Sequence, residues 1–151
     1  MTDEAWQRIL DVNLNEVFWS CRSFGKRMLE LQQGAIVTVG SMSGYISNKP
    51  QKQVNYNPSN AAGHHLSRSL AGEWADRGVR VNSVAPTYVN TPMSNITAKD
   101  SQYCYVKMQK TTMRPMIDPE EVAAAIFFLA SPSAPTITGA ILPVDAGYTI
   151  W

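Results

Sequence analysis

The residue types that could carry out proton chemistry gather around a tyrosine at the start of a predicted helix. Asn60 follows Tyr56 by one helical turn, and Ser41 closes an apolar run upstream. Residues four apart on a helix share a face, so a lysine at position 60 would lower the pKa of the tyrosine phenol. Such a phenol is a usable acid and base near neutral pH. Asparagine is neutral, so the sequence indicates a proton-transfer site without its cation.

An alternation of helices and strands must position these side chains. Residues 3–31 are predicted to form one long amphipathic helix, ended by Gly34, and residues 35–39 a strand buried on both faces, as in a parallel sheet. The apolar stripe of the helix consists of Trp6, Leu10, Leu14, Val17, Cys21, Phe24 and Met28.

The rest of the chain continues this alternation. A helix is predicted at about residues 55–77, with Gly78 as its stop, and a strand at 79–85. A third helix starts at Asp118-Pro119-Glu120-Glu121, a capping box with proline at the first helical position. The last strand, residues 140–144, contains a proline and therefore indicates a sheet edge. The pattern predicts a parallel α/β fold that is three strands deep.

Residues 87–117 show no clean period and contain four of the seven methionines. We expect a mobile lid with short helices there. The methionines suit an adaptable apolar cover over a pocket, and they suit core filling equally well.

Composition restricts the classes of partner. A net charge of +1 and scattered basic residues give no reason to expect nucleic acid or a membrane surface. Met1-Thr2-Asp3-Glu4 does not resemble a signal peptide, and we expect the cytosol. Cys21 and Cys104 are expected to be free thiols, although one disulfide is conceivable. His64 and His65 are adjacent and point in different directions on a helix, so no metal site is expected.

Several stretches occur in the order and spacing of a known family: Trp6–Leu14, Ile36–Ser41, Tyr56–Ser59, Gly78–Asn82, Ala85-Pro86, Val89–Met93, Pro119–Val122, Thr138-Gly139 and Val144-Asp145. Through them the chain resembles the short-chain dehydrogenase/reductase family, and within it the polyol and sugar-alcohol dehydrogenases. The resemblance implies the C-terminal part of a Rossmann-like doubly wound parallel sheet with flanking helices. The Gly-rich turn that seats the cofactor pyrophosphate in that family has no counterpart in these 151 residues.

The resemblance also implies roles for single residues. Tyr56 matches the general acid/base, Ser41 the hydroxyl that holds the substrate oxygen, and Asn13 the asparagine that keeps a water in the proton relay. Asn60 occupies the position of the catalytic lysine, which binds the nicotinamide ribose. The residues implied to contact the cofactor are Tyr56, Asn60, Pro86, Val89 and Thr91.

Four further positions depart from the family pattern. Thr87 and Ala146 each replace a glycine, and we expect both changes to have little effect. Pro115 and Ile117 replace an arginine and a glycine in the predicted lid, where we expect an altered geometry.

These features together predict a single partial domain, residues 1–151, of a truncated NAD- or NADP-dependent oxidoreductase of polyols or ketoses. We expect the isolated chain to bind the cofactor weakly and to be inactive or nearly so. An alternative is a non-enzymatic module that pairs with a full-length relative, or with itself as a homo-oligomer, through its long helices. A third possibility is a gene fragment without a selected function.

Overall fold

The sheet of the computed structural model has three parallel strands in the order β1-β2-β3, which confirms the predicted parallel α/β fold. The strands are β1 (Gly34–Val39), β2 (Val79–Pro86) and β3 (Ile141–Val144). The structure describes residues 1–49, 51–92, 94, 111–113 and 116–151. Within this part of the chain no helix is long and apolar enough to cross a membrane.

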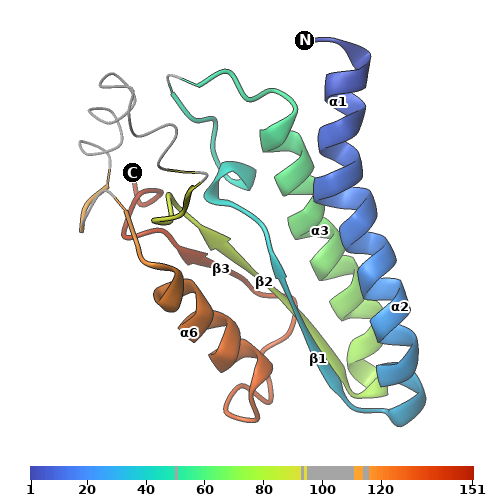
Figure 1. Ribbon diagram of the computed structural model, residues 1–151. Coiled ribbons are helices and arrows are strands. Elements are labelled where there is room, and N and C mark those ends of the chain that lie inside the picture. The colour runs from blue at the N-terminus through green and yellow to red at the C-terminus, as the bar shows by residue number, and fades with distance from the viewer. Residues whose placement is uncertain (50, 93, 95–110, 114–115) are drawn as a thin grey trace.

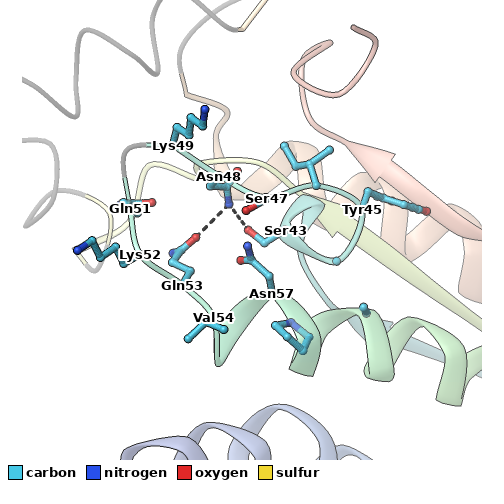
Figure 2. A pocket seen from close by; sticks show the side chains of 14 residues that line it. Ser43, Tyr45, Ser47, Asn48, Lys49, Gln51, Lys52, Gln53, Val54 and Asn57 are labelled. Atoms are coloured by element: carbon cyan, nitrogen blue, oxygen red, sulfur yellow. Dashed lines mark hydrogen bonds between the residues drawn. The ribbon is translucent and has the colours of Figure 1, made fainter. Parts of the chain in front are cut away.

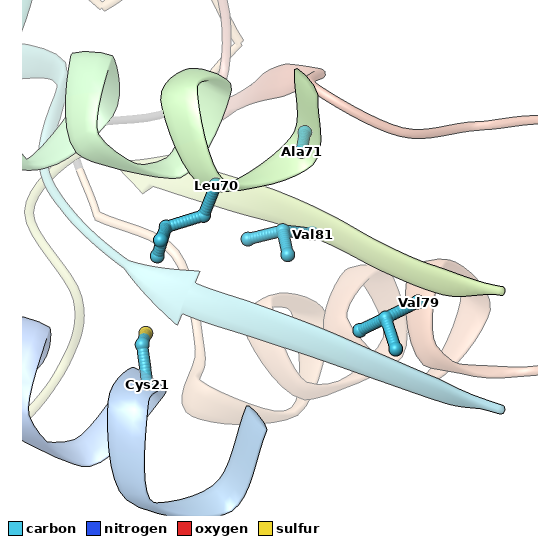
Figure 3. Packing of buried hydrophobic residues seen from close by; sticks show 5 residues of the cluster. All are labelled: Cys21, Leu70, Ala71, Val79 and Val81. Atoms are coloured by element: carbon cyan, nitrogen blue, oxygen red, sulfur yellow. The ribbon is translucent and has the colours of Figure 1, made fainter. Parts of the chain in front are cut away.

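Helices cover both faces of the sheet (Figure 1). The helices α1 (Asp3–Leu10), α2 (Glu16–Leu31) and α3 (Tyr56–Trp74) lie on one face, and α6 (Pro119–Ala130) lies on the other. Two apolar clusters fill the spaces between these layers. One joins α2, α3 and β2 through Cys21, Leu70, Ala71, Val79 and Val81 (Figure 3). The other joins β2 and α6 through Val84, Ile117, Val122 and Leu129.

The predicted long first helix is interrupted by a π-helical turn at Asp11–Asn15. Helix α2 ends at Leu31 because Gln32 adopts a left-handed conformation, with φ of 51°. The prediction that Gly34 ends the helix is therefore wrong, since Gly34 begins β1. A Cβ atom at Gly34 would lie 2.6 Å from Cγ of Met28, so this position needs a glycine for close packing.

The apolar stripe of the first helix was predicted too broadly. Cys21 is buried, whereas the side chain of Phe24 is 69% exposed and that of Trp6 is 37% exposed. Strand β1 is likewise only partly buried, and Val39 at its end is 59% exposed, so the expected burial on both faces is wrong. The physical reason is the position of β1 at the edge of the described sheet, where its outer side has no neighbouring strand.

The other predicted boundaries are confirmed. Helix α3 passes into a short turn of 3-10 helix that ends at Gly78, whose φ is 77°. At the start of α6, a carboxylate oxygen of Glu121 accepts a hydrogen bond of 2.8 Å from the backbone N–H of Asp118. The proline of the last strand, Pro143, lies in β3, an edge strand as predicted.

The predicted lid is described only at its two ends. Val89 pairs with Ile117 in an isolated parallel bridge, and the N–H of Asn90 donates to the Ile117 carbonyl at 2.8 Å. Ile117 is 3% exposed and belongs to the apolar cluster that joins β2 and α6. Its side chain therefore holds the C-terminal end of the predicted lid in the core. The predictions for Pro115 and Cys104 lie outside the described residues.

Candidate active site

Ser41 lies just beyond the C-terminal end of β1, at the start of a tight turn. Its Oγ accepts a hydrogen bond of 3.2 Å from the backbone N–H of Ser43. The ring of His64 packs under this turn, because Cβ atoms placed at Gly40 and Gly44 would each lie 2.6 Å from it. His64 is a packing residue and is 4% exposed. Its support of the serine turn was not foreseen from the sequence.

Tyr56 is the first residue of α3, and its backbone carbonyl is the end point of a chain of hydrogen bonds. The Asn13 side-chain amide, in the π-helical turn, donates to Ser59 Oγ at 3.0 Å, and this hydroxyl donates to the Tyr56 carbonyl at 2.8 Å. The Asn60 amide donates to the same carbonyl at 2.9 Å. The structure therefore connects three of the predicted site residues. π-Helical turns inside α-helices are frequent at functional sites.

A small cavity lies between Asn13 and Asn60, and Gly40 and Ser83 also line it. Its volume is about 10 Å³, close to the space that one water molecule needs. None of the side chains that line this cavity is a cation. The cavity has room for one water, and the positive charge that the resemblance implies at position 60 has no counterpart among these residues.

The residues implied to contact the cofactor lie where β2 ends. Pro86 is the last residue of β2, and Val89 forms the bridge to Ile117. Thr91 Oγ accepts a hydrogen bond of 3.4 Å from the N–H of Ser94. Ser41 follows β1 at the same end of the sheet, since the N–H of Gly40 donates to the Val84 carbonyl near the end of β2. Ligands of parallel α/β sheets bind at this carboxyl end.

Tyr88 is a residue of this region that the sequence did not single out. Burial raises the pKa of its phenol, and the phenols of Tyr148 and Tyr56 raise it further. Its ring packs edge-on against Tyr148 at a centroid distance of 6.0 Å, and its hydroxyl donates to Gln51 Oε1 at 3.3 Å. The hydrogen bond to Gln51 connects Tyr88 to the loop that precedes Tyr56, the predicted acid/base.

A hollow of about 780 Å³ lies beside these residues, between the segment after the serine turn and the start of α3. We call it the loop hollow; residues 43–49, 51–54, 57, 58 and 61 line it (Figure 2). Asn48, which the sequence did not single out, donates from Nδ2 to Ser43 Oγ at 2.5 Å and to Gln53 Oε1 at 3.1 Å. Ser41 and Tyr56 do not line the hollow itself.

The expectation that Ala146 and Thr87 have little effect needs correction. Ala146 has a φ of 51°, a left-handed conformation that a Cβ atom disfavours and that glycine adopts freely. Thr87 is 9% exposed, and its hydroxyl oxygen has no hydrogen-bond partner in the described structure. Both replacements of a family glycine therefore carry a physical cost.

No group of three or more metal-ligating side chains is present among the residues that the structure describes. The arrangement offers a hydroxyl after one strand and a phenol at a helix start, with an amide network behind them. These are groups that hold a substrate oxygen and exchange a proton with it.

Comparisons with known proteins identify the family. The profile of the family described as Enoyl-(Acyl carrier protein) reductase matches residues 1–149. Galactitol 2-dehydrogenase of Rhizobium johnstonii is 54% identical over 151 residues, which are 100% of this chain and 59% of that protein. The L-tagatose-forming galactitol 2-dehydrogenase of Cereibacter sphaeroides is 48% identical over 99% of this chain and 59% of its own length.

Solved structures are also similar to this chain over nearly all of its length. The crystal structure of gox2181 has a TM-score of 0.98 and 47% identity, covering 100% of this chain and 59% of that one. A structure from Beutenbergia cavernae, provisionally assigned as an NAD(P)-dependent gluconate 5-dehydrogenase, holds NADP at low occupancy. Its TM-score is 0.91 with 34% identity, over 98% of this chain and 59% of that chain. The chain thus spans about three fifths of the length of these relatives.

Proposed function

Because the chain belongs to the short-chain dehydrogenase/reductase family, we propose that it provides the substrate and proton-transfer part of an NAD(P)-dependent oxidoreductase of polyols and ketoses. The observation that carries the proposal is the hydrogen-bonded chain from Asn13 through Ser59 to Tyr56. It fixes the helix start that presents the phenol, next to the turn that presents Ser41.

In the proposed reaction Ser41 Oγ donates a hydrogen bond to the substrate oxygen and holds it near the phenol. When a polyol is oxidised, its hydroxyl proton passes to the Tyr56 oxygen, and when a ketose is reduced the phenol returns that proton. A bound nicotinamide supplies the hydride chemistry. Pro86, Val89 and Thr91 would hold it, because they lie at the end of β2, beside Ser41 at the end of β1.

Asn60 does not fit the task of the lysine it replaces. Its amide is bonded to the carbonyl of Tyr56 in its own helix and is 6% exposed. The side chain therefore offers neither a positive charge to the phenol nor a free ammonium to the ribose. We propose that this 151-residue chain, tested alone, binds NAD(P) weakly and turns substrate over slowly or not at all.

The test is a fusion of this chain to the remaining N-terminal part of the galactitol 2-dehydrogenase of Rhizobium johnstonii. NAD- and NADP-linked oxidation of a polyol panel is measured with Asn60, Asn60→Lys and Asn60→Gln, and with Tyr56→Phe in the lysine background. We expect lysine to raise kcat by roughly 10- to 1000-fold, the range of about one to three pKa units of tuning. Glutamine is the uncharged control. Undiminished turnover with Tyr56→Phe would overturn the assigned chemistry.

A second role, pairing with another copy or with a full-length relative, is favoured by a separate observation. Large apolar side chains are exposed along α1, α2 and the turn between them, namely Trp6, Val12, Phe18, Trp19, Phe24 and Leu31. Exposed apolar patches of this kind mark interaction surfaces. Light scattering on the chain mixed with the Rhizobium johnstonii enzyme tests this role, and no change in mass would exclude it for that partner.

A further inference from the structure

The loop hollow has the size and the lining of a small-molecule site. Its volume of about 780 Å³ falls in the range of ligand pockets. Amide and hydroxyl side chains from the segment after the serine turn face the first turns of α3 across it (Figure 2). Such groups recognise hydroxyl-rich compounds through hydrogen bonds.

Among the described lining residues, two acceptor atoms are buried and have no hydrogen-bond partner. Asn48 is 5% exposed, and both N–H groups of its amide point at oxygens, one of Ser43 and one of Gln53. Within the described part of the chain, neither its Oδ1 atom nor Oδ1 of Asn57 accepts a hydrogen bond. Buried acceptors without a donor are unfavourable, so a ligand that donates O–H groups at these positions would be favoured.

The charge of the hollow has one sign. Of the described residues around the hollow, Lys49 and Lys52 are the ones that are charged at neutral pH (Figure 2). The ion pair found in the described part of the chain, Arg27–Glu30, involves neither of them. Because no carboxylate occurs among the lining residues that the structure describes, the two ammonium groups remain available to an anion.

We propose that the loop hollow binds a polyhydroxylated anion, a sugar acid or a sugar phosphate. Its hydroxyl groups donate to Asn48 and Asn57, and its carboxylate or phosphate lies between Lys49 and Lys52. This inference deepens the proposed function, because the hollow adjoins the reaction site. Ser43, which lines it, donates to Ser41, and Asn57 directly follows Tyr56. The substrate class is thereby narrowed from polyols and ketoses in general to those that carry an acidic group.

The test compares three probes that share one carbon skeleton, D-gluconate, sorbitol 6-phosphate and sorbitol. Saturation-transfer NMR titrations measure their dissociation constants on the full 151-residue chain at low salt. We expect at least one of the two anions to bind about 10-fold more tightly than sorbitol, the effect expected of about two partly exposed charge contacts. Tighter binding of D-gluconate would indicate a sugar acid as the ligand, and tighter binding of sorbitol 6-phosphate a sugar phosphate.

Variants of the lining residues test whether the two lysines cause the preference for anions. Lys49→Gln together with Lys52→Gln should remove the preference for the anions, whereas Lys26→Gln, an exposed lysine of α2, should preserve it. Asn57→Ala should weaken all three probes equally. Equal affinity for anions and sorbitol, a preference that survives the double replacement, or no saturable binding would each overturn the inference. None of these outcomes bears on the Tyr56-dependent turnover of the fusion protein, so the two proposals fail separately.

Discussion

The side-chain amide of Asn60 donates a hydrogen bond of 2.9 Å to the backbone carbonyl of Tyr56, one turn earlier in α3. Position 60 therefore stabilises the start of the helix, and its polar group turns back to the main chain. A lysine here, as the family resemblance implies, would present a charge to the phenol and the cofactor. Under the proposed function, asparagine at this position contributes to local structure and supplies no charge for proton chemistry.

Cofactor binding by this chain should be weak. We expect NADH and NADPH to bind no more tightly than about millimolar, because the 151 residues contain no Gly-rich turn for the pyrophosphate. Asn60→Lys should change this little. Isothermal titration calorimetry measures the affinity, with the galactitol 2-dehydrogenase of Rhizobium johnstonii as the positive control. A micromolar dissociation constant for the chain would contradict the prediction.

Ala146→Gly should stabilise the protein. The φ of 51° at Ala146 places its Cβ in conflict with the neighbouring backbone, and glycine removes that conflict at a gain of about 1 kcal/mol. The urea midpoint at constant slope measures the change. Ala75→Gly is the matched control, since Ala75 has a right-handed φ of −62° and the same exchange there should destabilise by about 0.5–1 kcal/mol.

The stability of the fold should depend on His64 between neutral and mildly acidic pH. Burial, and then the nearby charge of Arg68, hold the pKa of His64 below its ordinary value of 6.5. The unfolded chain therefore binds a proton that the folded chain excludes, and stability falls as the pH decreases through about 6.5. Above that pH the contribution is constant.

Urea unfolding at pH 8, 6.5 and 5.5 checks this dependence. His64→Leu should flatten the slope of stability against pH over this interval, whatever its effect on stability at pH 8. His65→Gln should leave the slope unchanged, because His65 is the exposed neighbour on the same helix. An identical pH dependence in the protein and in His64→Leu would refute the assignment.

The isolated chain should self-associate through the region of β1. Val39 is 59% exposed at the end of this edge strand, and Phe24 is 69% exposed beside it in a groove that both residues line. Light scattering coupled to size exclusion should give a mass above 16.7 kDa. Val39→Lys should shift the mass toward the monomer. Val54→Lys, at a position 62% exposed on the far loop, should leave it unchanged.

The sequence predicted the elements of the fold well where local chemistry determines them. The capping box at Asp118, the left-handed Gly78 and the edge proline Pro143 each follow from the residue itself and its neighbours. The π-helical turn around Asn13 could not be predicted, because an extra residue in a helical turn leaves the apolar spacing almost intact. The exposure of Phe24 could not be predicted either. It depends on which parts of the protein pack beside β1, and the apolar pattern of a single helix carries no information about that.

The candidate site was predicted from family spacing, and the structure adds what spacing cannot provide. Ser59 joins Asn13 to Tyr56 only because the π-helical turn and α3 pack against each other. His64 supports the serine turn only because two glycines, Gly40 and Gly44, leave room for its ring. Asn48 enters the site through a hydrogen bond within its own loop, and Tyr88 through a hydrogen bond to Gln51, and the spacing of apolar residues predicts neither contact.

The two edge strands of the described sheet, β1 and β3, differ in whether they can pair with a further strand. The N–H groups of Ser83 and Thr87 donate to the carbonyls of Ala140 and Val144, so the nitrogen of Pro143 points outward from β3. A proline nitrogen carries no hydrogen, and a further strand would find no donor there. Strand β1 has no such block on its outer side. A partner strand that extends the described sheet by main-chain hydrogen bonds is therefore expected to pair with β1 and not with β3.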